Sequence, residues 1–177
     1  MNTYVAILRG INVSGQKMIK MTALKTMFED MHFENVRTYI QSGNVVFTAQ
    51  STVVRDLQKQ IHEAIQESFA FDVPVIVLNE KEWSAVQDQN PFLEERSEDI
   101  AKLHVTFLSE EPQKDLVRKL EETAQFPPDE WILSGRSVYL FCPGGYGNTK
   151  LNNNFFEKKL KVTATTRNWK TVNALSA

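Results

Sequence analysis

The chain has 177 residues, of which 42% are hydrophobic and 24% charged, and its formal net charge is −2. A chain of this length can bury about 70% of the surface that its unfolded form exposes, so it needs no metal or disulfide to fold. This composition excludes disordered and collagen-like proteins. The longest apolar run, residues 73–78, is too short to cross a membrane. The single cysteine, Cys142, fits a reducing compartment, and the N-terminus shows no signal-peptide pattern, so we expect a soluble cytoplasmic protein without a membrane partner.

The first 80 residues predict the element order β-α-β-β-α-β, which is the ferredoxin-like unit. A helix face is visible in Leu24, Met27 and Phe28, and Ser42-Gly43 indicates a hairpin turn. The expected strands lie at residues 3–9, 36–41, 45–48 and 73–78, and the helices begin near Thr22 and at Ser51 or Thr52, whose side chains are suited to cap a helix.

The same order restarts after a connecting segment, residues 81–100. The expected strands lie at residues 103–109, 131–133, 137–142 and 162–166; one helix opens at Pro112, one carries Leu151, Phe155 and Leu160, and a last one closes the chain from Arg167. Ser134-Gly135 repeats the Ser-Gly hairpin signal. We therefore predict the α+β class, with two tandem ferredoxin-like halves at 1–80 and 101–177 and antiparallel sheets.

Two loops are longer or richer in glycine than a connection requires. Residues 10–20 follow the first strand of the first half, and residues 143–149 follow the third strand of the second half. We expect the first and third strands of each half to be parallel neighbours, so that both loops lie at the same end of their own sheets. Loops that exceed the needs of connection often carry function.

Strand 3–9 is apolar on both sides, with Val5 and Ile7 on one and Tyr4, Ala6 and Leu8 on the other. The helices of a ferredoxin-like unit cover only one face of the sheet, and continuous apolar runs are typical of sheets covered on both. We expect the other repeat or a second chain to cover the free face.

Five segments carry a resemblance to a known family: residues 4–13, 36–47, 90–92, 144–151 and 164–172. Together they resemble the bacterial family catalogued as domain of unknown function 1697. The resemblance implies tandem ferredoxin-like domains, as the element order does, and it implies no settled activity. Where family members often have a second glycine before the first helix, this chain has Ser14.

The first candidate site is the loop that begins at Arg9. Gly10 and Asn12 lie between a strand and a helix, where unpaired backbone N–H groups and the helix dipole favour an anion, and Arg9 adds a charge. The alternative is structural: Arg9 and Asn12 hold their own loop in place. Neither nucleotide-binding glycine fingerprint is present.

The second candidate site is the glycine-rich run before the last long helix. Gly144, Gly145 and Gly147 permit close approach of backbone to a ligand. Thr149 is suited to cap the helix, and Lys150 to contact a phosphate. The alternative is a flexible connection with Thr149 as an ordinary cap.

Arg167 and Asn168 form a third polar cluster, for which the alternative is a helix start anchored by Trp169. They belong to a basic segment that runs from Cys142 to the C-terminus and contains six basic residues and one acid, Glu157. This segment makes nucleic acid an alternative partner, which the near-neutral charge of the whole chain disfavours. The sheet aromatics Tyr4 and Phe47 do not match the RNA-recognition pattern.

Catalytic signals are sparse. The histidines, His32, His62 and His104, lack metal-ligand spacing, and Cys142 has no second cysteine nearby in the sequence. We predict no metal and no cofactor, a non-catalytic Cys142, and leave catalytic residues unassigned. The favoured function is binding of a phosphate-bearing or other anionic small ligand at the two loops; the alternatives are nucleic-acid binding and a homo-oligomerisation or interaction module.

Overall fold

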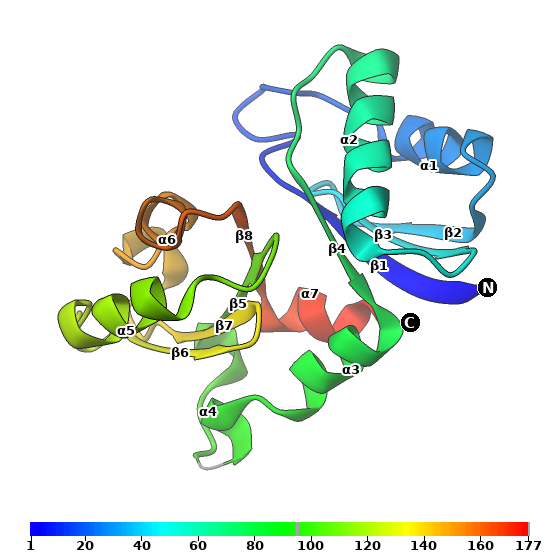
Figure 1. Cartoon of the computed structure of the whole chain (residues 1–177). Helices are drawn as coiled ribbons and strands as arrows, with labels where there is room; N and C mark the ends of the chain where they lie inside the picture. The colour runs from blue at the N-terminus through cyan, green and yellow to red at the C-terminus, as the bar shows by residue number, and fades with distance from the viewer. Residues whose placement is uncertain (95, 177) are drawn as a thin grey trace. The chain divides into compact units, whose positions relative to one another are not determined.

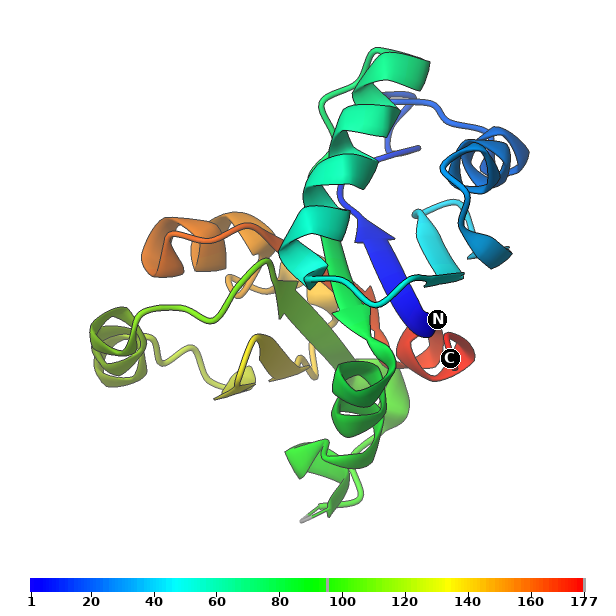
Figure 2. The same ribbon diagram turned by 45° about the vertical axis from the view of Figure 1, so that its right-hand side comes forward.

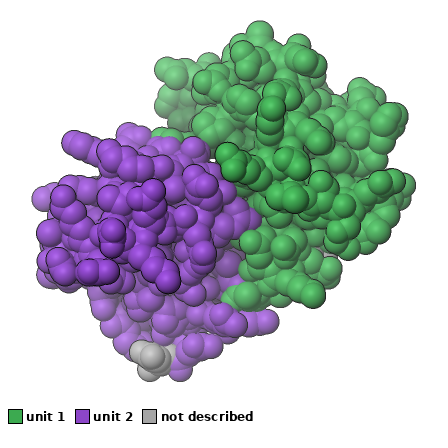
Figure 3. Space-filling view, viewed as in Figure 1, with its two compact units in different colours: residues 1–85, 175–177 green, residues 86–174 purple. Residues whose placement is uncertain are grey.

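The computed structural model describes residues 1–94 and 96–176. The chain divides into two compact units, the first made of residues 1–85 with the C-terminal residues from Leu175 and the second of residues 86–174 (Figure 3). Within the described residues, no helix is both long enough and apolar enough to cross a membrane.

The first unit holds a four-stranded antiparallel sheet with the strand order β2-β3-β1-β4. Helices α1 and α2 pack together on one face of this sheet (Figures 1 and 2). Its elements are β1 (Asn2–Leu8), α1 (Met21–Asp30), β2 (Glu34–Tyr39), β3 (Asn44–Ala49), α2 (Val54–Phe69) and β4 (Val75–Asn79), and α3 (Glu80–Asp88) runs across the division into the second unit.

The second unit repeats this arrangement with the strand order β6-β7-β5-β8 and with α5 and α6 on one face. Its elements are α4 (Pro91–Glu94), the 3₁₀ turn η1 (Ile100–Lys102), β5 (Leu103–Leu108), α5 (Lys114–Thr123), β6 (Glu130–Ser134), β7 (Ser137–Phe141), the 3₁₀ turn η2 (Tyr146–Asn148), α6 (Asn153–Leu160), β8 (Ala164–Asn168) and α7 (Trp169–Ala174). The predicted fold class, with two antiparallel sheets in ferredoxin-like order, is confirmed.

The core of the first unit follows from the alternation of side chains along β1. Tyr4, Ala6 and Leu8 point into the helix-covered core. Phe47 is buried there as well, and its ring centroid lies 5.7 Å from that of Tyr4. Since both aromatic rings are buried under the helices, they are not available to stack on bases as in RNA-recognition modules. Val5 and Ile7, on the opposite side of the strand, are also buried.

The neighbouring strands β1 and β3 run antiparallel, with Tyr4 opposite Phe47 and Ile7 opposite Asn44. The expectation that the first and third strands are parallel is wrong, because the hairpin between β2 and β3 reverses the chain direction before β3 returns beside β1. Loops that follow the first and the third strand therefore leave a sheet at opposite ends.

Four helix starts differ from the predicted caps. The residues at the caps of α1, α2 and α5 are Lys20, Val53 and Gln113, and none of them makes a side-chain capping bond. Of these four helices, α6 alone has a side-chain cap, and this is Asn152 rather than Thr149: its carboxamide oxygen accepts from the N–H of Phe155 at 2.9 Å. Helices α1, α2 and α5 are thus stabilised by packing of their apolar faces and not by a side-chain cap.

Gly43 is the most constrained glycine of the first unit. Its φ is +87°, and a Cβ there would lie 2.7 Å from Ile11 Cδ1 and 2.9 Å from Leu8 Cβ. The second-unit counterpart, Gly135, has a φ of +60°, but the nearest atom to its Cβ would be 3.7 Å away. Both positions favour glycine on backbone grounds, whereas only Gly43 lacks space for a methyl group.

Gly43→Ala should lower the free energy of unfolding by about 2–4 kcal/mol, because backbone strain and overpacking add. Gly135→Ala, the matched control, should cost only about 1–2 kcal/mol, because it adds backbone strain alone. Urea unfolding followed by circular dichroism measures both values. Equal losses in the two variants would contradict the packing argument at Gly43.

Candidate functional site

The glycine-rich loop after β7 is an ordered double turn. The N–H of Gly145 donates to the carbonyl of Cys142 at 2.9 Å, and the N–H of Asn148 donates back to Gly145 at 3.2 Å. The Asn148 side chain closes the loop by donating to the carbonyl of Gly144 at 3.0 Å. The prediction of a flexible connection, offered as the alternative for this segment, does not describe such a hydrogen-bonded loop.

Glycine is required at only one of the three glycine positions in this loop. Gly145 has φ +90° and ψ 148°, a backbone region that is essentially restricted to glycine. Gly144 and Gly147 have ordinary φ values, and a Cβ at any of the three positions would meet nothing within 4 Å. The loop is therefore open on its outer side, and its backbone can be approached closely.

Several backbone donors of this loop are available to a ligand. The N–H groups of Gly144, Gly147 and Lys150 donate to no group in the described part of the chain. An unpaired exposed N–H is hydrated in the free protein and can exchange its water for an anionic oxygen. Donors of this kind are what the glycine content predicts for an anion site.

Thr149 connects the loop to the start of β6. Its hydroxyl donates to Asp129 Oδ2 at 2.6 Å and accepts from the N–H of Leu151 at 3.1 Å. Thr149 is 8% exposed. It therefore fixes the position of Asp129 and the course of the chain toward α6, while the cap of that helix is Asn152.

A pocket of about 490 Å³ opens between this loop and the turn before β6. Its lining is Gln125, Phe126, Pro127, Pro128, Asp129, Gly144, Gly145, Asn148 and Lys150. The ammonium group of Lys150 lies 5.7 Å from the centre of the Phe126 ring. Lys150 thus makes a cation–π contact with Phe126, and both side chains belong to the lining of the pocket.

The hairpin register explains why these two segments meet. Glu130 pairs with Phe141, so the residues just before β6 lie beside those just after β7. Phe126, Asp129 and Asn148 were not among the predicted site residues. The Ser134-Gly135 turn signal could have placed Asp129 there, because counting outward from the turn brings it opposite Cys142.

Cys142 lies beneath this pocket and is fully buried. Burial raises the pKa of its thiol to about 11; the hydrogen bond with Thr149 opposes the rise, and the Asp129 carboxylate adds to it. A thiol with this pKa is protonated at neutral pH and is a poor nucleophile. The geometry agrees with a packing role for Cys142.

The side chains of Arg167 and Asn168 make hydrogen bonds within β8 and to the start of α7. Arg167, 8% exposed, donates from Nη1 to the Thr165 hydroxyl at 3.1 Å and to the Thr166 carbonyl at 3.0 Å. Burial lowers the pKa of Arg167 to about 10, against the opposing influence of Tyr146, so it remains charged at neutral pH. Asn168 Oδ1 accepts from the N–H of Thr171 at 2.8 Å, which is the helix-start arrangement given above as the alternative.

His104 joins β5 to the glycine-rich loop, a contact that the sequence did not indicate. Its ring stacks on that of Tyr146, with centroids 4.9 Å apart and an interplanar angle of 23°. Burial lowers the pKa of His104, so the neutral imidazole is favoured at neutral pH. Among the described residues, no three His, Cys, Asp or Glu side chains cluster closely enough to hold a metal ion.

The first candidate loop lies in the other unit and uses Asn12 to hold itself together. Asn12 Nδ2 donates to the carbonyls of Ile19 at 3.0 Å and Gln41 at 2.8 Å, and its Oδ1 accepts from the N–H of Ile19 at 2.8 Å. The backbone N–H of Arg9 donates to Pro74 at 3.0 Å. Asn12, with φ +54°, has the left-handed conformation that asparagine tolerates better than most residues. This geometry favours the structural interpretation for Asn12, whereas Gly10 has open space around it.

The comparisons with known proteins bear on the fold and on the family of the chain. A solved structure of a conserved bacterial protein from Streptococcus pneumoniae has a similar fold, with a TM-score of 0.73 and 21% identity over 99% of this chain and 97% of that one. No curated protein matches the chain. The family model described as a protein of unknown function (DUF1697) matches residues 1–139. The chain belongs to this family; the glycine-rich loop and β8 lie beyond the matched residues.

Asn12→Gly should lower the free energy of unfolding by about 1–3 kcal/mol, because it removes three hydrogen bonds while glycine still accepts the positive φ. Ser14→Gly is the control, since Ser14 is exposed in the same loop with a φ of +51°. Chemical denaturation of both variants measures the difference. An Asn12→Gly variant as stable as the Ser14→Gly control would exclude the structural role.

The Cys142 thiol of the folded protein should react with a disulfide reagent at pH 8 at least about a hundredfold more slowly than in urea, because a pKa of about 11 leaves about 0.1% thiolate. The free energy of unfolding should also fall as the pH rises from about 9 to about 11. In this range the thiol of the unfolded chain loses its proton, whereas the buried thiol of the folded chain keeps it. Rapid labelling of the native protein would show that this assignment is wrong.

Proposed function

We propose that the second unit binds a phosphate-bearing small molecule in the pocket between the glycine-rich loop and the Phe126–Asp129 turn. The observation that carries the proposal is the concentration of unpaired N–H donors from Gly144, Gly147 and Lys150 on a loop that lines a pocket of about 490 Å³. Anionic oxygens are the ligands that several backbone donors and one ammonium group recognise together.

The charges lining this pocket favour a ligand of modest negative charge. Lys150 supplies the positive charge, and Asp129 is the acidic side chain of the lining. The Thr149 hydroxyl bonds one Asp129 oxygen at 2.6 Å, which stabilises the carboxylate without removing its charge. Asp129 therefore weakens the binding of a highly charged anion, and a phosphate ester or diester fits this balance better than a polyphosphate.

The basic side chains of α6 have a structural explanation that does not require nucleic acid. Lys158 and Lys159 lie in the last turn of this helix, where positive charges stabilise the negative end of the helix dipole. The small-ligand proposal therefore rests on Lys150, which lines the pocket, rather than on the basic segment as a whole.

The test is calorimetric titration with inorganic phosphate, phenyl phosphate and AMP as probes. Lys150→Ala should weaken binding by about ten- to a hundredfold, because one charge-assisted hydrogen bond contributes about 1.5–3 kcal/mol. Asp129→Asn should strengthen it, because it removes a repulsive charge and keeps an acceptor for Thr149. Lys159→Ala, on the same unit and outside the pocket lining, should leave the affinity unchanged.

Each alternative gives a different result in this experiment. Equal affinity in the Lys150→Ala variant and the parent would remove this pocket as the site, and absence of binding by all three probes at millimolar concentration would overturn the proposal. Salt-sensitive oligonucleotide binding that Lys159→Ala weakens as much as Lys150→Ala would favour the nucleic-acid alternative.

A further inference from the structure

The pocket beside the glycine-rich loop is larger than a phosphate group. Its volume of about 490 Å³ lies within the range of about 300–1,000 Å³ that small-molecule sites occupy. A phosphate held by the loop therefore leaves room in the pocket for the group that is esterified to it. The hydrogen-bonding capacity of the remaining lining residues limits the chemistry of that group.

The turn at residues 126–129 lines one side of the pocket and offers a ligand no free backbone donor at its last three positions. Pro127 and Pro128 have no N–H. The N–H of Asp129 donates to the carbonyl of Phe126 at 2.9 Å. An anionic oxygen would therefore receive no hydrogen bond from the backbone here, in contrast to the glycine-rich loop.

The carboxylate of Asp129 is the strongest acceptor in the lining. Its Oδ2 accepts from the Thr149 hydroxyl at 2.6 Å, and its Oδ1 accepts from no residue in the described part of the chain. Each carboxylate oxygen can accept about two hydrogen bonds. The Thr149 bond holds the carboxylate in position, so its unused acceptor sites are available to a donor group on a ligand.

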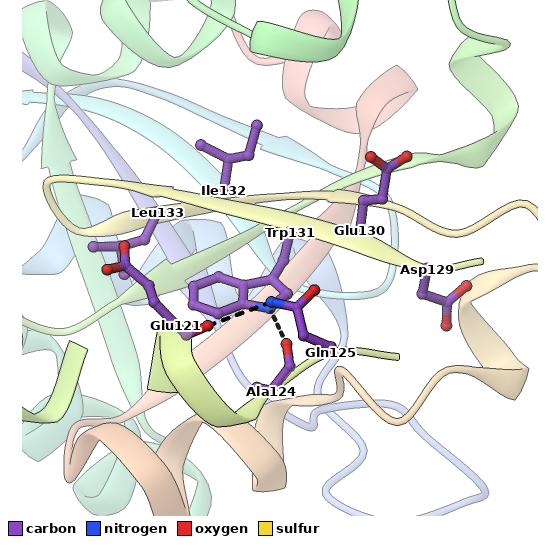
Figure 4. A pocket seen from close by; sticks show the side chains of 8 residues that line it. All are labelled: Glu121, Ala124, Gln125, Asp129, Glu130, Trp131, Ile132 and Leu133. Atoms are coloured by element: carbon purple, nitrogen blue, oxygen red, sulfur yellow. Dashed lines mark hydrogen bonds between the residues drawn. The ribbon is translucent and has the colours of Figure 1, made fainter. Parts of the chain in front are cut away.

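Two amide side chains in the lining also present acceptors. The carboxamide nitrogen of Gln125 donates to the carbonyl of Glu121 at 3.3 Å; Figure 4 shows this contact in the neighbouring pocket around Trp131. The carboxamide nitrogen of Asn148 donates to the carbonyl of Gly144 at 3.0 Å. Neither amide oxygen accepts a hydrogen bond from the residues that the structure describes. Because one donor of each amide is already used and the acceptor is not, both side chains favour a donor group on the ligand.

The lining therefore combines donors for a phosphate with acceptors for the group that carries it. The donors are the N–H groups of Gly144 and Lys150 and the Lys150 ammonium, and the acceptors are Asp129, Gln125 and Asn148. Hydroxyl and ammonium groups are the donors that a small phosphate ester commonly carries. Lys150 would repel a second ammonium in the same pocket, whereas an uncharged hydroxyl pairs with a carboxylate or an amide alike.

We propose that the ligand is a polyol or sugar phosphate, an assignment that rests on the phosphate-binding function proposed for this pocket. The phosphate binds the loop through the Gly144 and Lys150 donors, and the hydroxyls donate to Asp129 and Gln125. Asp129 then has a favourable role, because its charge strengthens the hydrogen bonds from the hydroxyls while it weakens the binding of the phosphate itself. A phosphate on a hydrocarbon chain would leave these acceptors without partners and bind more weakly.

Calorimetric titration with two matched esters tests the assignment. Glycerol 3-phosphate and propyl phosphate have the same carbon chain and differ by two hydroxyls. The parent protein should bind glycerol 3-phosphate at least about tenfold more tightly, because a hydrogen bond to the carboxylate is charge-assisted and a tenfold change corresponds to about 1.4 kcal/mol. Ribose 5-phosphate, which carries more hydroxyls, should also bind more tightly than propyl phosphate.

The Asp129→Asn variant separates the contact with the hydroxyls from the general effect of charge. The loss of one negative charge strengthens the phosphate contact of both esters alike, so the ratio of their affinities reports on the hydroxyls. This ratio should fall by about three- to tenfold, because the charge-assisted bonds are lost while an amide oxygen still accepts from Thr149. Asp115→Asn is the matched control: Asp115 lies in the first turn of α5, outside the pocket lining, and should leave the ratio unchanged.

Equal affinity for the two matched esters, or a ratio that Asp129→Asn does not change, would overturn the assignment and leave the proposed function intact. Tighter binding of phosphoethanolamine than of glycerol 3-phosphate would overturn it in favour of an ammonium-bearing ester. If the parent bound none of these esters at millimolar concentration, the proposed function would fail together with it. Circular dichroism confirms that both variants are folded.

Discussion

Ser134 and Ser137 face each other across a two-residue turn, and every later pairing between β6 and β7 follows from this closure. The pair farthest from the turn sets Glu130 opposite Phe141. The turn that contains Asp129 therefore lies beside the glycine-rich loop. A single hairpin register thus brings together the two segments that line the pocket, one with hydrogen-bond donors and one with acceptors.

The two loops singled out by their length and glycine content differ in how their polar groups are used. In the first, the Asn12 side chain makes three hydrogen bonds to backbone groups of residues 19 and 41. In the second, Asn148 and Thr149 hold the loop, while several N–H groups are left without a partner in the described part of the chain. Backbone donors that the protein does not satisfy are the property expected of a ligand loop, so glycine count alone does not separate the two cases.

Strong local patterns made most of the fold predictable. Short apolar and β-branched runs such as that of β1, together with the Ser-Gly turns, placed the strands and both hairpins within one or two residues. Helix starts were less accurate, because Thr22, Ser51 and Thr52 look like caps but make no capping bond. At these positions tertiary packing, which a local pattern does not contain, decides where the helix begins.

The candidate site was predictable only in part, because its pocket is lined by two separate segments of the chain. The sequence indicated Gly144, Gly145 and Lys150, which do line the pocket. Phe126 and Asp129 have no chemical signal of their own and become relevant only through the hairpin register. The stacking of His104 on Tyr146 likewise depends on how the loop after β7 returns across β5, which spacing along the chain does not reveal.

The close fit of Gly43 also bears on the order in which the first unit assembles. The β2–β3 hairpin is local and can form within microseconds, whereas β1 must find β3 across some forty residues of intervening chain. Ile11 can settle against Gly43 only after β1 has docked, because the side chain occupies the space above a turn that already exists. We therefore expect residues 10–20 to become ordered late, after the pairing of β1 with β3 has set the register of the sheet.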